Sequence, residues 1–172
     1  TCVHKSNVMR ITDGMFAKAC TDVSKDYPDI KFEEMYVDAC AMNLIRQPEK
    51  FDVVVTTNLF GDILSDESSQ VVGGLGMAPA ANLGDDFALF EPVHGAAFDI
   101  AGQNIANPSS FLLSIKMMLD WLGAKHNDQK CFEMATKLES TIFNLVKSGI
   151  KTKDIGGDVT TTEFTKQITD NL

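Results

Sequence analysis

The sequence predicts an α/β fold, and three observations support this prediction. From Thr1 to about residue 70, strand-like stretches alternate with stretches of helical spacing, which is the order typical of α/β proteins. The segment 51–56 is a continuous, β-branched run, as a buried parallel strand would have. Apolar residues make up 44% of the chain and charged residues 23%, so the composition is that of a globular protein rather than a disordered segment.

The first part of the chain is expected to hold three strands, at residues 1–4, 31–38 and 51–56. Helical spacing of apolar residues predicts two helices between them, at residues 13–28 and 39–48. Asp13 is the expected N-cap of the first helix, and Pro28 follows its end. Asp38 is expected to end the second strand. The second helix stops at Pro48.

The rest of the chain begins with a Gly-rich segment, 71–84, which is the expected crossing between two domains. A strand running into a loop follows at residues 88–95. Three further helices are expected, at residues 108–123, at residues 127–147 and at the C-terminus, where Thr161 is the expected cap. Pro108 begins the first of these and Gly123 ends it, in agreement with the preference of helices for proline at the start and glycine past the end.

Charge and cysteine content narrow the class of protein. Fifteen basic and twenty-four acidic residues give a net charge of −9, which argues against nucleic acid or a membrane surface as the main partner. No apolar run is long enough to span a membrane. The four cysteines show no metal-binding spacing and are expected to be reduced thiols in the cytoplasm. The chain starts at Thr1 inside a strand-like segment, so we expect it to be a fragment.

Asp62 and Asp66 lie one helical turn apart in "NLFGDILSDESSQ" and would share a face of a helix that opens just after residues 58–61. With Asp38 they form a set of oxygen ligands without histidine or cysteine nearby. Such a set suits Mg²⁺ or Mn²⁺, which keep positions open for substrate oxygens. The alternative is that Asp62 caps the helix and Asp66 lies on its solvated face. Spacing alone leaves both interpretations open.

Lys5 and the loop 90–108 are the other candidates. A lysine that is desolvated or near other cations can be tuned to transfer protons, although most lysines at strand ends are merely solvated, and position alone favours that interpretation of Lys5. The loop has small residues for close backbone approach to a nucleotide. Asp99 could accept hydrogen bonds from ribose hydroxyls and repel a 2′-phosphate, which favours NAD over NADP. The loop lacks G-x-G-x-x-G, and a purely structural loop with Asp99 as a turn former is the alternative.

Four stretches together resemble one family: "HKSNVMRITDGMF", "EEMYVDACAMNLIRQPEKFDVVVTTNLFGDILSD", "GGLGMAPAANLG" and "FEPVHGAAFDIAGQNIANP". They are similar to the metal-dependent β-decarboxylating dehydrogenases, which act on 3-isopropylmalate, isocitrate or homoisocitrate. The resemblance implies the C-terminal half of an isopropylmalate dehydrogenase-like two-domain fold. Residues 1–73 would complete the smaller, dimer-forming domain with the metal-binding acids. Residues 74–172 would be the C-terminal part of the larger sheet domain with the NAD-binding loop.

The resemblance also implies roles for individual residues. Asp62 and Asp66 would bind Mg²⁺ or Mn²⁺ in one subunit, and Asp38 would come from the other subunit of a homodimer as both a metal ligand and a catalytic residue. Lys5 would cross the same interface and transfer a proton. The residues implied to bind NAD are Asn7, Glu91, His94, Gly95, Ala96, Ala97, Asp99, Ile100 and Asn107.

The activity implied is oxidative decarboxylation of a small anionic 2-hydroxy acid, with hydride transfer to NAD. The motifs favour 3-isopropylmalate, a substrate of leucine biosynthesis, over isocitrate and homoisocitrate, and a non-catalytic regulatory subunit is a further alternative. Family members also use a Gly-Asp-Gly segment, an arginine clamp and a tyrosine from their first half. Arg10 and Arg46 do not match the clamp, so the chain as given is expected to be incomplete as a catalyst.

Overall fold

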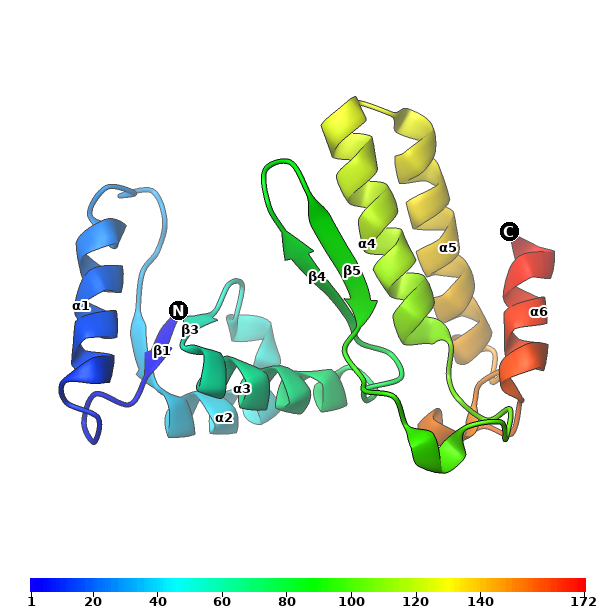
Figure 1. The fold of residues 1–172 in the computed structure, drawn as a ribbon, viewed down its shortest axis with the longest axis horizontal. Helices are drawn as coiled ribbons and strands as arrows, with labels where there is room; N and C mark the ends of the chain where they lie inside the picture. The colour runs from blue at the N-terminus through cyan, green and yellow to red at the C-terminus, as the bar shows by residue number, and fades with distance from the viewer. The chain divides into compact units, whose positions relative to one another are not determined.

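The computed structural model describes residues 1–172 and divides into two compact units, Thr1–Val71 and Val72–Leu172 (Figure 1). The predicted domain boundary after residue 73 lies close to this division. The assignment of the two parts to a dimer-forming domain and a cofactor domain stays a prediction. Each unit has its own hydrophobic core and is described by itself.

The first unit is built on a parallel sheet of three short strands in the order β2-β1-β3. The strands are β1 (Cys2–His4), β2 (Glu34–Tyr36) and β3 (Val55–Thr56). The helices are α1 (Thr12–Ser24), α2 (Val37–Arg46) and α3 (Asn58–Val71), with the 3₁₀ helix η1 (Pro48–Lys50) after α2. Buried Val3, Cys40, Leu44 and Leu64 join β1, α2 and α3 into one core. Parallel strands connected through helices confirm the predicted α/β class.

Several predictions for the first unit are wrong in detail. Asp13 is not an N-cap, because α1 begins at Thr12 and Asp13 lies buried in its first turn. Asp38 does not end a strand, since β2 stops at Tyr36 and Asp38 belongs to α2. The predicted buried run at 51–56 forms only a two-residue strand, in which Val55 is exposed, and the preceding Val53 is 70% exposed. β3 lies at the edge of the sheet, where side chains have fewer neighbours to cover them.

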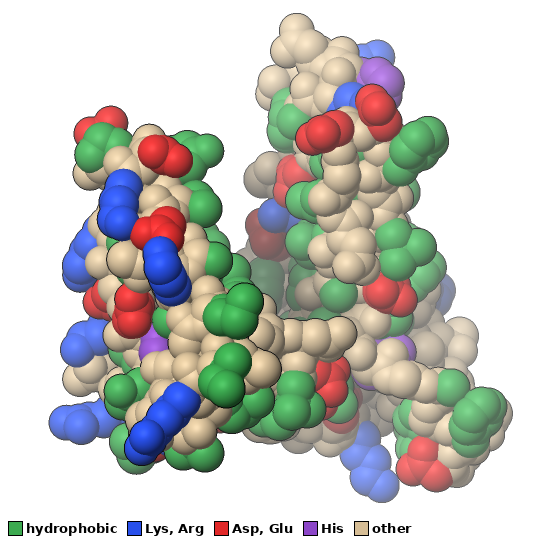
Figure 2. All heavy atoms as spheres, turned by 60° about the vertical axis from the view of Figure 1, so that its left-hand side comes forward, with side chains coloured by type: hydrophobic (Ala, Val, Ile, Leu, Met, Phe, Trp, Pro, Cys, Tyr) green, Lys and Arg blue, Asp and Glu red, His purple; other side chains and the backbone are tan.

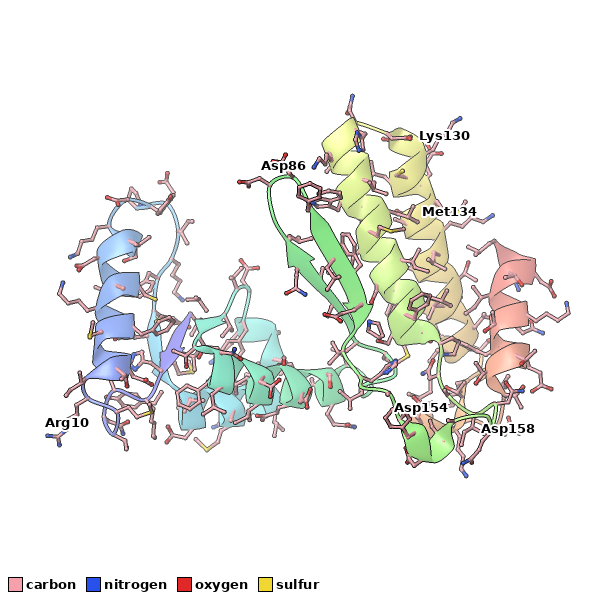
Figure 3. All side chains as sticks on the ribbon, in the orientation of Figure 1. Arg10, Asp86, Lys130, Met134, Asp154 and Asp158 are labelled. Carbon is pink, nitrogen blue, oxygen red and sulfur yellow. The ribbon has the colours of Figure 1, made fainter.

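The second unit combines a β-hairpin with a helical layer. Strands β4 (Pro79–Leu83) and β5 (Ala88–Pro92) pair antiparallel, with Asp86 at the tip of the hairpin (Figure 3). Helices α4 (Ser109–His126) and α5 (Gln129–Lys147) run side by side (Figure 1), and α6 (Thr161–Asn171) packs on α5. Short 3₁₀ helices occur at η2 (Phe98–Ile100) and η3 (Lys153–Ile155). The core comprises Met77, Leu113, Leu138, Ile142, Leu145, Phe164 and Ile168.

Two buried serines on α4 fix the helix against the hairpin. The Ser110 hydroxyl donates to the carbonyl of Ala78 at 2.5 Å, and the Ser114 hydroxyl donates to the carbonyl of Glu91 at 2.7 Å. Both serines are buried, so these bonds satisfy groups that would otherwise lack a partner in the core. The N-terminal half of α4 is therefore held against the hairpin, at the start of β4 and near the end of β5.

The second unit also departs from the sequence prediction. Strand β4 was not predicted, because its sequence "PAANL" lacks β-branched residues. Gly123 does not end α4 but lies inside it, where an added Cβ would be 3.0 Å from the Phe132 ring of α5. The glycine thus permits close helix packing, and Asn127 in the left-handed conformation ends the helix instead. Thr160, rather than Thr161, caps α6 through a capping box with Glu163.

Charged side chains of both signs are interspersed with hydrophobic ones over the visible surface (Figure 2). None of the helices combines the length and the apolar character that crossing a bilayer requires.

Candidate functional site

Lys5 and Asp38, the two residues predicted to be catalytic, form an ion pair in the first unit. Lys5 directly follows β1, and Asp38 lies in the first turn of α2, so the parallel pairing of β1 with β2 brings them together. The Lys5 Nζ lies 2.5 Å from Asp38 Oδ1. This hydrogen bond from Lys5 is the main cause that holds the pKa of the Asp38 carboxyl below its usual value. The Lys5 side chain is 22% exposed and that of Asp38 is 67% exposed, so the pair faces solvent mainly through the acid.

A histidine and an aromatic ring line the inner side of this pair. The Tyr36 ring centroid lies 5.7 Å from Lys5 Nζ and packs edge-on against buried His4. The Ser6 N–H donates to His4 Nδ1, so we assign the proton of the neutral ring to Nε2, which lies 3.2 Å from Glu34 Oε2. A hydrogen bond from the Thr21 hydroxyl, followed by that of His4, lowers the pKa of Glu34. The polar contacts therefore fix the end of β1 next to Lys5.

Asp62 and Asp66 lie on the exposed face of α3. Neither carboxylate has a hydrogen-bond or ion-pair partner within the chain, and no cluster of three or more His, Cys, Asp or Glu side chains able to hold a metal forms. The interpretation of Asp62 as a helix cap is wrong, because α3 begins at Asn58. The chain thus presents two free carboxylates one turn apart, while Asp38 is paired with Lys5.

The loop between β5 and α4 surrounds a hollow of about 430 Å³ in the second unit. Its wall is formed by Leu75, Gly76, His94, Ala97, Ile100, Ile105, Ala106, Asn107, Lys153 and Asp154. A second hollow of about 420 Å³ on the same loop is lined by His94, Gly95, Ala96, Ala97, Ile100, Ala101, Gly102, Asn104 and Ala106. Gly and Ala residues of the loop line both hollows, and the binding of a nucleotide by this loop stays a prediction.

Asp154 ties the distal turn η3 to this loop (Figure 3). Its Oδ2 accepts a hydrogen bond from the Asn107 amide at 3.0 Å, and its Oδ1 accepts one from the Thr152 hydroxyl at 2.6 Å. An added Cβ at Gly76 would lie 2.5 Å from Asp154 Oδ2 and 3.0 Å from Asn107 Cβ. Only glycine at position 76 therefore leaves space for the contact between Asn107 and Asp154.

The predicted cofactor-binding residues of the second unit differ in their positions relative to the two hollows. His94, Ala97 and Ile100 line the larger hollow, and Ala97 adopts a left-handed φ of 45°. Gly95 and Ala96 line the smaller one. Asp99 is exposed in η2 and lines neither.

Three further predicted residues have other surroundings. The buried Asn107 is already engaged, since its Oδ1 accepts from the Ser109 N–H at 3.0 Å while its amide donates to Asp154. Glu91 lies exposed on β5, where its Oε1 accepts from the Asn82 amide at 3.4 Å. In the first unit, Asn7 is exposed in the turn after Lys5.

Sequence reasoning missed the part of the hollow that comes from outside the loop. Leu75, Gly76, Lys153 and Asp154 all line it. The available signal was the segment "KTKDIGG" at 151–157, where an acid between lysines precedes two glycines. Gly157 in this segment passes so close to the backbone of Lys151 that no side chain would fit there. A turn under such a constraint indicates a specific tertiary contact.

Comparison with known proteins assigns the chain to one family. The family described as isocitrate/isopropylmalate dehydrogenase matches residues 1–171. The 3-isopropylmalate dehydrogenase of Sulfurisphaera tokodaii is 54% identical over 173 residues, which cover 100% of this chain and 51% of that protein. An isocitrate/homoisocitrate dehydrogenase of Thermus thermophilus is 48% identical over 98% of this chain and 48% of its own length. This chain therefore belongs to the isocitrate/isopropylmalate dehydrogenase family.

A solved structure supports the same conclusion. The crystal structure of isocitrate dehydrogenase from Methylococcus capsulatus superposes with a TM-score of 0.89 at 40% identity, covering 99% of this chain and 49% of that one. The two-domain isopropylmalate dehydrogenase-like fold, represented here by part of its length, is thereby confirmed. The chain spans about half the length of the curated relatives it matches.

Proposed function

We propose that this chain is part of an NAD-dependent, metal-dependent dehydrogenase that oxidises and decarboxylates a 2-hydroxy acid, with 3-isopropylmalate as the substrate. The observation that carries the proposal is the ion pair between Lys5 and Asp38, which brings an ammonium group and a carboxylate from separate elements to one position. An ammonium group that donates to a carboxylate 2.5 Å away is well placed to pass a proton to or from a bound hydroxy acid.

The residues present fit a divalent metal ion in part. Asp62 and Asp66 offer unpaired, exposed carboxylate oxygens on one helix face, which is the donor chemistry that Mg²⁺ and Mn²⁺ prefer. Two protein ligands leave room for substrate oxygens and for a third acid. In the proposed dimer, Asp38 of a second subunit would be that third acid.

The loop between β5 and α4 fits the adenosine part of NAD. A hollow of about 430 Å³ is of the size that small ligands occupy, and the carbon-rich walls formed by Ile100, Ile105 and Ala106 suit a flat aromatic ring. His94, Asn107 and Asp154 add a few polar groups to this wall. The exposed Asp99 next to Ile100 would repel a 2′-phosphate, which favours NAD over NADP.

The roles of this chain's residues follow from their positions. Lys5 would exchange a proton with the substrate, and Asp38 would hold the lysine in place or accept the proton in turn. Asp62 and Asp66 would orient the hydroxyl and carboxylate of the substrate through a shared metal ion, and Asn7 would contact the cofactor near its reactive ring. When bound, the metal supplies Lewis-acid polarisation of substrate oxygens, and NAD accepts the hydride.

Three substrates remain candidates. The 54% identity to a 3-isopropylmalate dehydrogenase, against 48% to an isocitrate/homoisocitrate dehydrogenase, favours 3-isopropylmalate and hence leucine biosynthesis. Isocitrate and homoisocitrate are the alternatives, and a regulatory subunit without catalysis is a less favoured one. The intact pair of Lys5 and Asp38 supports a catalytic subunit, because a subunit without catalysis has no use for it.

We further propose a cytoplasmic homodimer whose active sites each combine residues of both subunits. The net charge of −9 disfavours nucleic acid and anionic membranes as partners, so the small anionic substrate would bind through the metal and local cations. Lys5 and Asp38 lie next to each other on one chain, so both would enter the partner's site together.

NADH production by the full-length protein tests the proposal. With Mg²⁺ present, we expect turnover of 3-isopropylmalate to exceed that of isocitrate and homoisocitrate. The Lys5→Ala substitution should lower the turnover of 3-isopropylmalate by at least about a hundredfold, because it removes a general acid–base group. A preference for isocitrate or homoisocitrate would replace the substrate assignment. No turnover of any substrate, with NAD and Mg²⁺ still bound, would favour the regulatory subunit.

A further inference from the structure

Asp13 is an acid buried in the first unit without a cationic partner. It is 2% exposed in the first turn of α1. Its Oδ2 accepts the backbone N–H of Lys5 at 2.7 Å, and its other oxygen lies 3.4 Å from the Thr12 hydroxyl. A buried carboxylate is costly unless it is well hydrogen-bonded, so the bond to Lys5 is the main compensation that the structure offers.

The bond closes a compact loop between Lys5 and Asp13. The Lys5 carbonyl accepts hydrogen bonds from the N–H groups of Val8 at 2.9 Å and Met9 at 2.8 Å. The Met9 carbonyl accepts from the N–H of Asp13 at 3.1 Å. Asp13 thus joins both ends of the loop, and the backbone of Lys5 is held through its N–H and its carbonyl.

A simpler role for Asp13 accounts for only part of this geometry. An acid in the first turn of a helix interacts favourably with the helix dipole, and an exposed acid would serve that purpose equally well. The interaction with the helix dipole explains neither the burial of Asp13 nor the hydrogen bond that its Oδ2 accepts from the Lys5 amide. The side chain of Lys5 is held at its far end by Asp38, so the residue is fixed at both ends.

We infer that Asp13 is a positioning residue for Lys5: its carboxylate fixes the backbone from which the lysine reaches the substrate. The inference rests on the proposed role of Lys5 in proton transfer. Asp13 is 2% exposed and contacts only its own unit, so it would act through Lys5. A displacement of a catalytic group by about 1 Å can cost roughly a hundredfold in rate, so loss of the bond should lower kcat more than it alters substrate binding.

The test compares four variants of the full-length protein: Asp13→Ala, Asp13→Asn, Asp22→Ala and Lys5→Ala. Asp13→Ala removes the acceptor, and kcat should fall by roughly 10- to 100-fold while the KM values for the hydroxy acid and NAD change by less than about threefold. Asp13→Asn keeps an oxygen that can accept the Lys5 N–H and should restore most of kcat. Asp22 lies on the same helix and pairs at the surface with Lys18 and Lys25, so Asp22→Ala should leave kcat unchanged.

Thermal unfolding of each variant gives the second measurement. A lower Tm in Asp13→Ala with kcat retained at a temperature where it is folded would overturn the inference, as would an Asp13→Asn variant as slow as Asp13→Ala. Asp13→Ser, whose hydroxyl is one bond shorter, replaces Asp13→Ala if that variant does not fold, with the same expectation. If Lys5→Ala keeps wild-type turnover, the proposed function itself fails, whatever the Asp13 variants do.

Discussion

Replacing Gly76 by alanine tests how the hollow beside η3 is held in shape. The new Cβ would lie 2.5 Å from Asp154 Oδ2 and 3.0 Å from Asn107 Cβ, so the carboxylate must move away. Asp154 is exposed and can move at little cost, but the amide of buried Asn107 would lose its bond at 3.0 Å and keep only the weaker contact with the Met77 sulfur at 3.5 Å. A hydrogen bond to a charged group contributes about 1.5–3 kcal/mol, and we expect the free energy of unfolding to fall by up to that amount.

The assays are urea unfolding and calorimetric titration with NAD on the full-length protein. Gly76→Ala should be less stable and bind NAD more weakly, because Asn107 and Asp154 both line the hollow. Gly14→Ala is the matched control: an added Cβ there meets nothing within 4 Å, and alanine in a helix should stabilise by up to about 1 kcal/mol. In the double variant with Asp154→Ala, the loss should be smaller than the sum of the single losses. Wild-type stability and NAD affinity in Gly76→Ala would refute this account of the contact.

Three further predictions concern the metal acids, a buried thiol and the packing of two helices. Asp66→Asn should raise the Mg²⁺ concentration for half-maximal turnover by at least about tenfold; an unchanged midpoint in a Mg²⁺ titration would remove Asp66 from the site. Burial, with a hydrogen bond involving Cys20, raises the pKa of the Cys2 thiol from 9.0 to about 12. The folded state therefore holds this proton more tightly, and the associated stability is present below pH 9 and lost between about pH 9 and 12. In urea unfolding, the free energy of unfolding of Cys2→Ala should fall less steeply between about pH 9 and 12 than that of the wild type. Equal slopes in the two proteins would count against the raised pKa of Cys2. Gly123→Ala places a Cβ 3.0 Å from the Phe132 ring. The cost of overpacking, about 1–3 kcal/mol, should exceed the roughly 1 kcal/mol gained in helix propensity, so the free energy of unfolding should fall. A variant that is more stable in urea would disprove this.

The sequence predicted the order of most helices and strands, because each depends on a local signal. Helical spacing located α1, α2, α4 and α5, and the strand-like start at Thr1 became β1. Errors occurred where tertiary contacts decide the outcome. Gly123 looks like the end of a helix but serves close packing against Phe132. Val53 and Val55 look buried in the sequence but lie near a sheet edge and stay exposed in this chain.

In the candidate site, too, features set by local spacing could be predicted and features set by tertiary contacts could not. Spacing alone was enough to put Asp62 and Asp66 on one helix face, since they lie a single turn apart on α3. The ion pair between Lys5 and Asp38 joins residues 33 positions apart and depends on the pairing of β1 with β2. Asp154 contacts Asn107 across 47 positions; the segment 151–157 signals a constrained turn, but nothing local in the sequence identifies Asn107 as its partner. Side chains that act through distant neighbours therefore required the structure.

The exposure of the pair formed by Lys5 and Asp38 has a consequence for how such subunits can evolve. An ion pair in which one partner faces solvent contributes little to folding stability, and here the acid is 67% exposed while the lysine side chain is 22% exposed. Mutations could therefore remove both charges while the sheet and helices around them persist. If the proposed function holds, a duplicated copy that lost both charges would lose proton transfer and still fold, which gives a direct route from the proposed catalytic subunit to a structural or regulatory paralogue.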